Sequence, residues 1–347
     1  MGPGLNIVAM GGGTGLSTLL RGLKRYVDSE GPWSVAALGA IVTVTDEGGS
    51  SGVLRKEFGM LPPGDIRNCI VALAEEEHLL SQLFNYRFDT DSALKGHSLG
   101  NLLLTAMCEI TGSFDNAVLA ASEVLAIRGE IYPSTLTDVR LRATLEDGTE
   151  LVGEVAISGS HIGEAPRTTV RHARITRIEL EPAGAEPTEG ALAALAMADL
   201  IIIGPGSLYT SVLPNLVIDK LAAALRNAKA LRVYICNVMT QPDETDNYSA
   251  QDHLKAIVEH AGLVVDVMVL NGRRPSDDIL QTYAAMNQYP VQSDLDAIRA
   301  LGVTPFFGDI IAEGDYVRHD PDALAQTVFQ LYDRYGRTLE RMRRDNT

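Results

Sequence analysis

The apolar residues of this chain form two kinds of pattern that alternate along its length. Short runs that are almost entirely apolar and rich in β-branched residues predict strands buried on both faces. They occupy residues 6–10, 35–44, 200–203, 232–236 and 264–270. Between these runs, apolar residues recur every three or four positions, as they do on one face of a helix. The alternation predicts an α/β fold with a doubly wound, mostly parallel sheet.

Polar and glycine residues predict where the helices begin and end. Helices are expected over residues 66–84, 99–110, 250–260 and 322–344. Asp65 and Ser98 are candidate N-caps of the first two, because their side chains can accept the free amides of a first turn. Gly262 is expected to end the third helix. The fourth becomes basic towards its end, which complements the helix dipole.

The middle of the chain has a different pattern, in which apolar and polar residues alternate one by one. This alternation covers residues 139–145, 151–157 and 174–180. The dipeptide Asp147-Gly148 separates the first two segments and is typical of a hairpin turn. We therefore predict a small β-rich insertion over 131–187, which interrupts one α/β domain formed by residues 1–130 and 188–347.

Composition and charge exclude several functional classes. The 347 residues carry a formal charge of −16, so general binding of nucleic acid or of an anionic membrane is not expected. Cys69, Cys108 and Cys236 form no zinc motif, and so few cysteines fit a reducing compartment. The chain has neither a signal-peptide pattern nor an apolar run long enough to span a membrane. We expect a soluble, cytoplasmic protein.

The first predicted strand continues into a glycine-rich segment, residues 11–17, that leads into a helix. Unpaired backbone amides at a helix N-terminus, together with the helix dipole, favour a phosphate group. Gly12, Gly13, Thr14 and Gly15 are therefore candidate phosphate-binding residues. The spacing matches neither the dinucleotide fingerprint nor a Walker loop, so NAD is a weaker candidate than another nucleotide. A tight turn that serves only packing is the alternative.

Two acidic residues and two serines follow the second predicted strand. Asp46 and Glu47 precede a flexible Gly-Ser segment that contains Ser50 and Ser51. Carboxylates in such a loop can hold Mg²⁺ against phosphate oxygens, while hydroxyl groups contact the ligand. Asp46 and Glu47 are therefore candidate metal ligands, and the two serines are candidate ligand contacts. A solvated surface loop is the alternative.

Two further loops carry polar residues near the start of a helix. Asp65 would act in catalysis only if the protein is an enzyme, and an aspartate in this position is more often a cap. Asn68, in the first turn of the same helix, can reach a ligand above the sheet. His97 can be a base, a hydrogen-bonding group or a simple loop histidine. Asn101 is a candidate for holding a base or a sugar hydroxyl.

A second glycine turn follows the apolar run at 200–203. Gly204, Gly206 and Ser207 repeat the order of strand, glycine turn and helix, which again suits a phosphate. Asn237 follows the next predicted strand. Ligands of open α/β sheets lie at the carboxyl ends of the strands. All of these loops are therefore expected to converge on one site for a ligand with two phosphates.

Six segments together resemble the bacterial gluconeogenesis factor family, which is related to 2-phospho-L-lactate transferase. They are GGGTGLS (11–17), TVTDEGGSSG (43–52), PPGDIRNC (62–69), GHSLGNLLL (96–104), ADLIIIGPGSLYTS (198–211) and NVMTQPDET (237–245). They follow the family's order and span most of the chain. The resemblance implies a modified Rossmann-like sheet that binds the nucleotide sugar UDP-N-acetylglucosamine. It also implies a cytoplasmic role in cell shape and wall-precursor supply during growth on gluconeogenic carbon sources.

The resemblance further implies which residues contact the ligand. By motif, the phosphate and nucleotide contacts are Gly12, Gly13, Thr14, Asn101, Gly206 and Ser207. Tyr283 and Arg318 look like the family positions that contact the uridine-linked sugar. A packing residue on a helix face and a surface ion pair are the respective alternatives.

Two residues depart from the family pattern. The family loop usually has a second aspartate where this chain has Glu47, and the extra methylene shifts a carboxylate within a strictly spaced Mg²⁺ site. The family also tends to have glycine where Asp243 stands. If that turn requires a positive φ, aspartate tolerates it better than most residues, but at some cost.

These residues lead to two functional hypotheses. The first is a regulator that binds a nucleotide sugar, forms a homo-oligomer and changes conformation for a partner enzyme of wall-precursor metabolism. No nucleophile–base pair is evident, which favours it. The alternative is a Mg²⁺-dependent transferase of phosphorus-containing groups, in which Asp46 and Asp65 hold the ion across a diphosphate.

Overall fold

The computed structural model describes residues 4–75, 77–89, 91–159, 173–314 and 316–336. A seven-stranded sheet in the order β10-β9-β8-β7-β1-β2-β3 forms the centre, and every neighbouring pair in it is parallel. Its strands are β1 (Leu5–Gly11), β2 (Val35–Val42), β3 (Glu130–Pro133), β7 (Leu200–Ile203), β8 (Leu231–Ile235), β9 (Val267–Asn271) and β10 (Thr304–Gly308). The predicted parallel α/β sheet is confirmed, and its five predicted strands are β1, β2, β7, β8 and β9.

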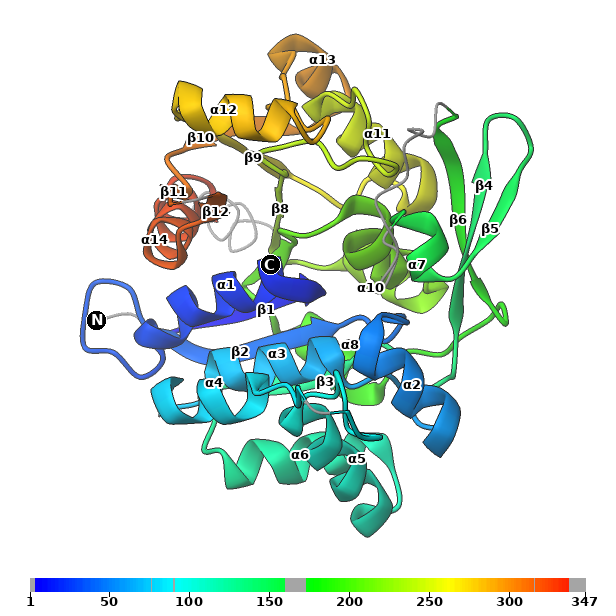
Figure 1. Cartoon of the computed structure of the whole chain (residues 1–347). Helices are drawn as coiled ribbons and strands as arrows, with labels where there is room; N and C mark the ends of the chain where they lie inside the picture. The colour runs from blue at the N-terminus through cyan, green and yellow to red at the C-terminus, as the bar shows by residue number, and fades with distance from the viewer. Residues whose placement is uncertain (1–3, 76, 90, 160–172, 315, 337–347) are drawn as a thin grey trace.

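Helices cover both faces of this sheet (Figure 1). On one side α1 packs against α3 and α14, while α8 contacts β1, β3 and α10. The helices are α1 (Gly13–Leu23), α2 (Gly49–Phe58), α3 (Gly64–Leu73), α4 (Glu77–Asn85), α5 (Leu99–Thr111), α6 (Phe114–Val124), α7 (Glu154–Ile157), α8 (Glu189–Met197), α9 (Leu213–Leu216), α10 (Asp219–Asn227), α11 (Ala250–Ala261), α12 (Asp277–Ala284), α13 (Leu295–Ala300) and α14 (Pro321–Leu331). This two-sided cover explains why the strands are apolar throughout rather than alternating.

The centre of the core lies where α1 packs on the sheet. Ile7, Ala9 and Met10 of β1 are almost fully buried. The apolar face of α1 is completely buried as well and consists of Leu16, Leu19, Leu20 and Leu23. Burial of each such side chain contributes about 1.5–3 kcal/mol. The glycine segment before α1 is thereby fixed at the carboxyl end of the central strand.

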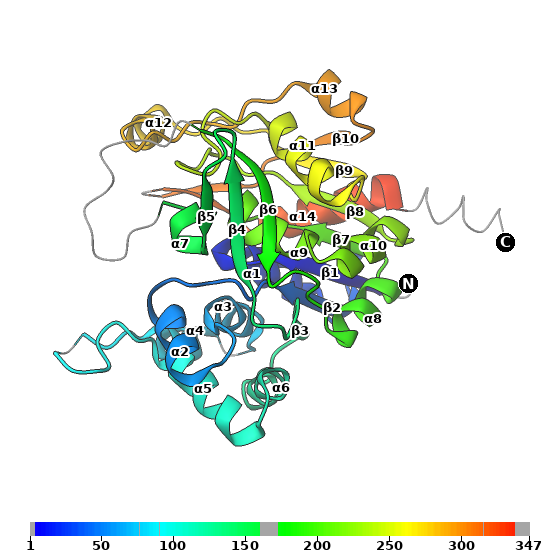
Figure 2. The same ribbon diagram turned by 90° about the vertical axis from the view of Figure 1, so that its right-hand side faces the viewer.

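The insertion is a three-stranded antiparallel sheet in the order β5-β4-β6. Its strands are β4 (Arg140–Leu145), β5 (Glu150–Val152) and β6 (Ile175–Glu181), and Figure 2 shows them as a layer of their own, with β6 beside α9 and α11. The predicted hairpin around Asp147-Gly148 is confirmed. The strand predicted over 151–157 is wrong in its second half, because Gly153, with φ of 94°, turns the chain into α7. The first residues of the range 131–187 belong to β3 and hence to the main sheet.

The helix predicted over 66–84 is two helices, α3 and α4. The chain leaves α3 at Ala74, whose backbone is extended and pairs with Ile127. The buried Lys24 Nζ also donates to the Ala74 carbonyl over 2.6 Å. These tertiary contacts override the helical periodicity. Asp65 is not the cap of α3, because Pro63 is the N-cap residue and Asp65 lies within the first turn.

Other predicted boundaries agree with the structure. Ser98 caps α5 by accepting the Asn101 amide, and Gly262 follows the end of α11. Asp243 has φ of 66°, the conformation expected where the family tends to have glycine. The predicted C-terminal helix begins as α14 and continues as a π-helical turn over Tyr332–Gly336, and residues 337–347 lie outside the described residues.

A short antiparallel pair, β11 (Ile311–Glu313) and β12 (Val317–His319), lies between β10 and α14 in the chain. Within the described ranges, none of the helices is by itself long and apolar enough to cross a membrane.

Gly22 in α1 provides a test of the packing that fixes the glycine segment. A Cβ there would lie 1.9 Å from the Pro321 carbonyl oxygen at the start of α14. We expect Gly22→Ala to lower the free energy of unfolding by about 1–3 kcal/mol, because backbone must move to relieve the overlap. Urea denaturation measures this change. Gly31→Ala is the control, since its Cβ would meet nothing closer than 3.8 Å; equal losses in the two variants would contradict the proposed packing.

Candidate functional site

A cavity of about 740 Å³ opens at the carboxyl ends of β1, β7 and β8. Ten of the predicted site residues line it: Gly12, Gly13, Thr14, Gly15, Asn68, Gly206, Ser207, Asn237, Tyr283 and Arg318. A volume of this size accommodates a ligand of several hundred daltons. Loops that are far apart in the sequence therefore do meet at one edge of the sheet.

The glycine segment forms the part of the cavity nearest β1. Gly12 is the N-cap residue of α1, and Gly13 has φ of 63°. A Cβ on Gly12 would lie 2.6 Å from Asp65 Oδ2, and one on Gly15 would lie 2.4 Å from the Pro205 carbonyl oxygen. The Gly13 amide donates to the Asp65 carboxylate. The next first-turn amides, of Thr14 and Gly15, have no intrahelical acceptor and are suited to an anion.

The second glycine turn packs directly against the first. Gly204 has φ of 74°, and its amide donates to the Met10 carbonyl of β1 over 2.8 Å. Gly204 therefore shapes the turn without lining the cavity. A Cβ on Gly206 would lie 3.4 Å from the Gly12 carbonyl oxygen. After Ser207 the chain forms a π-helical turn before the short α9, rather than the regular helix that the sequence pattern predicts.

Tyr283 and Arg318 line the cavity from α12 and β12, and β12 contacts α1. Tyr283 packs with Met239 and Ile279, and its hydroxyl group donates to the Val317 carbonyl over 3.2 Å. It is thus a packing residue that also lines the cavity. Arg318 is exposed and has no ion pair with any other described residue. Its guanidinium group is available to a ligand in the cavity.

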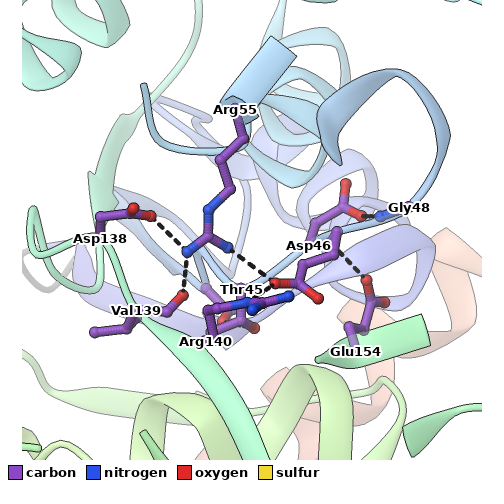
Figure 3. A network of polar contacts seen from close by, with 10 residues as sticks. Thr45, Asp46, Gly48, Arg55, Asp138, Val139, Arg140 and Glu154 are labelled. Carbon is purple, nitrogen blue, oxygen red and sulfur yellow. Dashed lines mark hydrogen bonds and ion pairs between the residues drawn. The ribbon is translucent and has the colours of Figure 1, made fainter. Parts of the chain in front are cut away.

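The carboxyl groups of Asp46, Asp65 and Glu154 meet beside the glycine segment. Asp46 accepts the Gly48 amide over 2.8 Å, and its Oδ2 atom packs against Gly64, where a Cβ would lie 2.3 Å away. Glu154, at the start of α7, lines the cavity, and its Oε2 accepts the Glu47 amide over 3.0 Å (Figure 3). Glu154 also shares a side-chain hydrogen bond with Asp46. The insertion thus contributes an acidic side chain to the site.

The proximity of these groups changes their affinity for protons. Burial, and then the charge of Asp46, raise the pKa of Asp65 to about 7. The same two causes raise the pKa of Glu154 to about 9. Carboxylates this close cannot all be ionised without strong repulsion. At neutral pH the site therefore favours a proton, or a cation, between them.

Glu47 lies apart from this group and faces the insertion. Its Oε1 atom accepts from Arg140 Nε over 2.6 Å and lies 3.6 Å from Arg55 Nη1 (Figure 3). Gly153 leaves room for it, since a Cβ there would lie 2.1 Å from Glu47 Oε2. Within the described part of the chain, no three His, Cys, Asp or Glu side chains are placed to hold a metal ion. Two carboxylates would suffice for Mg²⁺ only together with phosphate oxygens, which is its usual mode.

Four predicted contact residues lie behind the cavity and do not line it. They form a buried hydrogen-bonded layer: Ser50 with His97 Nδ1 at 3.0 Å, and Asn101 with Ser51 at 3.4 Å. Arg67 joins this layer to the cavity, because it donates to Asn101 over 3.2 Å. It also donates to Asn68 Oδ1 over 2.7 Å, and Asn68 lines the cavity. The role of this layer in the structure is to position other groups.

The cavity also contains polar residues that the sequence pattern does not single out. The most prominent are Arg21, Ser211, Gln241 and Glu154. Ser211 and Gln241 each lie inside one of the six resembling segments, and those segments were the available signal. No local signal marks Glu154, because its position depends on how the insertion folds back onto the main sheet.

Glu154 provides a pH test of the site. Its pKa is raised from 4.5 in the unfolded chain to about 9 in the folded protein. Between pH 4.5 and pH 9, therefore, the folded state keeps a proton on Glu154 that the unfolded chain has released. The stability of the wild type is therefore expected to fall as pH rises through this window. Glu154→Gln cannot ionise, so its stability relative to the wild type should increase from pH 5 to pH 9 in urea denaturation. The exposed Glu57→Gln is the control, and a parallel increase in both variants, or in neither, would contradict this account.

Comparisons with known proteins agree with this geometry. The family model of the 2-phospho-L-lactate transferase CofD matches residues 7–311. The chain is 44% identical to a gluconeogenesis factor of Halalkalibacterium halodurans over 96% of this chain and 99% of that protein. It is 43% identical to the gluconeogenesis factor of Bacillus subtilis over 95% of this chain and 99% of that protein.

A solved structure shows the same fold. The crystal structure of protein BH3568 from Bacillus halodurans superposes with a TM-score of 0.86 at 43% identity, and the match covers 94% of this chain and 100% of that one. Sequence identity at this level over nearly the whole length establishes membership of the family as well as the fold. The chain belongs to the CofD family and, within it, to the gluconeogenesis factors.

Proposed function

We propose that this protein binds a nucleotide sugar, UDP-N-acetylglucosamine, in the cavity at the carboxyl edge of the sheet. The observation that carries the proposal is that the two glycine turns and the free Arg318 line one cavity. The first-turn amides of α1 suit the diphosphate, because unpaired amides and the helix dipole both favour negative charge. Tyr283 and Arg318 line the same cavity, and in this proposal the sugar lies against them.

The charges around the cavity support a ligand with a diphosphate. Arg21 of α1 and Arg318 of the adjoining β12 both line it, so either guanidinium group can neutralise phosphate charge. Asp65 and Glu154 lie beside the glycine segment, and their raised pKa values favour the neutral carboxyl forms, which lessens the repulsion of an anion. The net charge of −16 does not oppose such a site, because a local arrangement of amides and guanidinium groups determines the field there.

We further propose that the bound form acts as a cytoplasmic regulator of cell shape and of wall-precursor supply during gluconeogenic growth. This proposal is supported by the fact that the chain belongs to the gluconeogenesis factors. In this proposal the ligand selects a conformation that a wall-precursor enzyme recognises, and the regulator forms a homo-oligomer. A ligand can shift such an equilibrium only by its difference in affinity for the two conformations.

Isothermal titration tests the ligand assignment. The full chain should bind UDP-N-acetylglucosamine and bind NAD much more weakly, since the dinucleotide fingerprint is incomplete. Heat of binding with NAD, together with none for UDP-N-acetylglucosamine, would overturn the assignment.

Gly15 tests the place of the diphosphate. In Gly15→Ala the new Cβ would lie 2.4 Å from the Pro205 carbonyl oxygen, so the two glycine turns must separate. We expect the affinity for UDP-N-acetylglucosamine to fall by roughly tenfold or more, in line with the cost of overpacking against backbone. The same titration measures it, and thermal unfolding verifies the fold. Gly31→Ala should bind like the wild type; unchanged binding by Gly15→Ala would rule out this position for the phosphates.

A second candidate function is a Mg²⁺-dependent transfer of a phosphorus-containing group. The observation that favours it is the pair of carboxylates, Asp46 and Asp65, beside the glycine segment of a chain that belongs to the CofD family. Mg²⁺ would neutralise the phosphate charge, and the residues of the cavity would position the donor. Glu47 is left out of this proposal because Arg140 and Arg55 hold it.

Asp46→Asn distinguishes the two functions. If the protein is a transferase, Mg²⁺ should support conversion of UDP-N-acetylglucosamine in the presence of an acceptor alcohol. Phosphorus NMR measures this conversion. The variant should then lose about two orders of magnitude in rate while binding persists. Asp115→Asn, on an exposed turn of α6, should keep the wild-type rate. A wild type that shows no conversion with Mg²⁺ supports the regulator instead.

A further inference from the structure

Three polar side chains form a hydrogen-bonded chain along the cavity between the ends of β7 and β8. Asn237 donates from Nδ2 to Gln241 Oε1 over 3.2 Å. Gln241 in turn donates from Nε2 to Ser207 Oγ over 2.8 Å. All three residues line the cavity. None of the roles considered above uses this arrangement.

The direction of these hydrogen bonds determines what each end offers. Ser207 Oγ already accepts a hydrogen bond from Gln241, so its own O–H group is available to donate to a ligand. At the other end, Asn237 Oδ1 is buried and, among the described residues, has no hydrogen-bond partner. Asn237 lines the cavity, and the soft χ2 torsion of asparagine allows a ligand to draw this oxygen towards itself. The cavity therefore offers one donor and one acceptor, linked through Gln241.

The unpaired oxygen makes this arrangement costly without a ligand. A buried polar atom that loses its partner costs about 1–3 kcal/mol. A ligand N–H group beside Asn237 would remove that cost, whereas a ligand with only acceptors would leave it. The Ser207 hydroxyl group beside it requires an acceptor on the same ligand. The complementary group is an N–H next to a carbonyl oxygen.

The order of the strands places this pair beyond the phosphates. The glycine segment follows β1, Ser207 follows β7, and Asn237 follows β8, and these strands are neighbours in that order. A ligand whose diphosphate lies at α1 therefore extends across Ser207 towards Asn237.

We propose that Ser207 and Asn237 recognise an amide-type edge of the ligand, with Gln241 as the positioning residue that orients both. Ser207 donates to the carbonyl oxygen of this edge, and Asn237 Oδ1 accepts from its N–H group. This inference rests on the proposed function and adds the chemical feature that the site selects. UDP-N-acetylglucosamine has two candidate groups. The uracil imide presents its N–H and carbonyl groups on one edge, whereas the acetamido group of the sugar is a trans amide whose N–H and carbonyl point in opposite directions, so it would lie between Ser207 and Asn237.

The test compares three ligands by isothermal titration with the full chain. They are UDP-N-acetylglucosamine, UDP-glucose, which lacks the acetamido group, and UDP-N-acetylglucosamine methylated at uracil N3, which lacks the imide proton. The wild type should bind at least one altered ligand about tenfold more weakly, because an unpaired buried acceptor remains. Loss with UDP-glucose identifies the sugar amide, and loss with the methylated ligand identifies uracil.

Two variants show whether the pair causes this preference. Asn237→Leu removes the acceptor, and in Gln241→Glu the new carboxylate accepts the hydrogen bond that the Ser207 hydroxyl group would otherwise donate to the ligand. In Asn237→Leu the difference between the ligands should shrink to about twofold or less, since the discriminating acceptor is gone. Gln241→Glu should instead weaken the binding of UDP-N-acetylglucosamine, since Ser207 no longer donates to the ligand. Gln326→Glu adds the same charge on an exposed part of α14 and should keep the wild-type preference. Thermal unfolding confirms that each variant folds.

The outcomes separate this inference from the proposed function. Equal binding of the three ligands by the wild type, or a preference that survives in Asn237→Leu, overturns the inference and leaves the nucleotide-sugar site intact. Absence of any binding of UDP-N-acetylglucosamine to the wild type overturns the proposed function and this inference together.

Discussion

Direct contact between two glycine turns is the constraint on which the site depends. A Cβ on Gly15 would lie 2.4 Å from the Pro205 carbonyl oxygen, and one on Gly12 would lie 2.5 Å from Thr43 Cγ2. The start of α1 is therefore held against the turn after β7 by backbone contacts that exclude side chains. The bottom of the cavity consequently consists of backbone amides and small hydroxyl groups. Such a surface favours an anion through fixed dipoles, without a permanent positive charge.

The insertion is part of this site as well as an addition to the sheet. Its helix α7 brings Glu154 to the cavity, where the carboxyl group meets Asp46. Arg140, from β4, holds Glu47 on the other side of the same loop. The loop after β2 is therefore fixed between the main sheet and the insertion. A ligand that moves Asp46 or Glu154, or changes their protonation, would also displace the insertion, because α7 carries Glu154. Ligand binding could in this way alter the protein surface that the insertion forms.

Much of this architecture could be predicted from the sequence, because the signals are local. Apolar runs identified β1 and β7, and glycine segments after them identified the turns that line the cavity. The errors arise where distant contacts decide the outcome. Ala74 ends α3 through its pairing with Ile127, although the helical periodicity continues. Glu154 reaches the cavity only through the fold of the insertion, and no spacing rule could show that. Ser50 and His97 have suitable chemistry, but each is the other's hydrogen-bond partner behind the site.

The central claim is that the first-turn amides of α1 bind the diphosphate of a nucleotide sugar. A crystal structure of the protein with UDP-N-acetylglucosamine tests this claim most directly. We expect phosphate oxygens within hydrogen-bond distance of the Thr14 and Gly15 amides, with the sugar towards Tyr283 and Arg318. A ligand bound outside this cavity, or one whose phosphates contact neither amide, would contradict it.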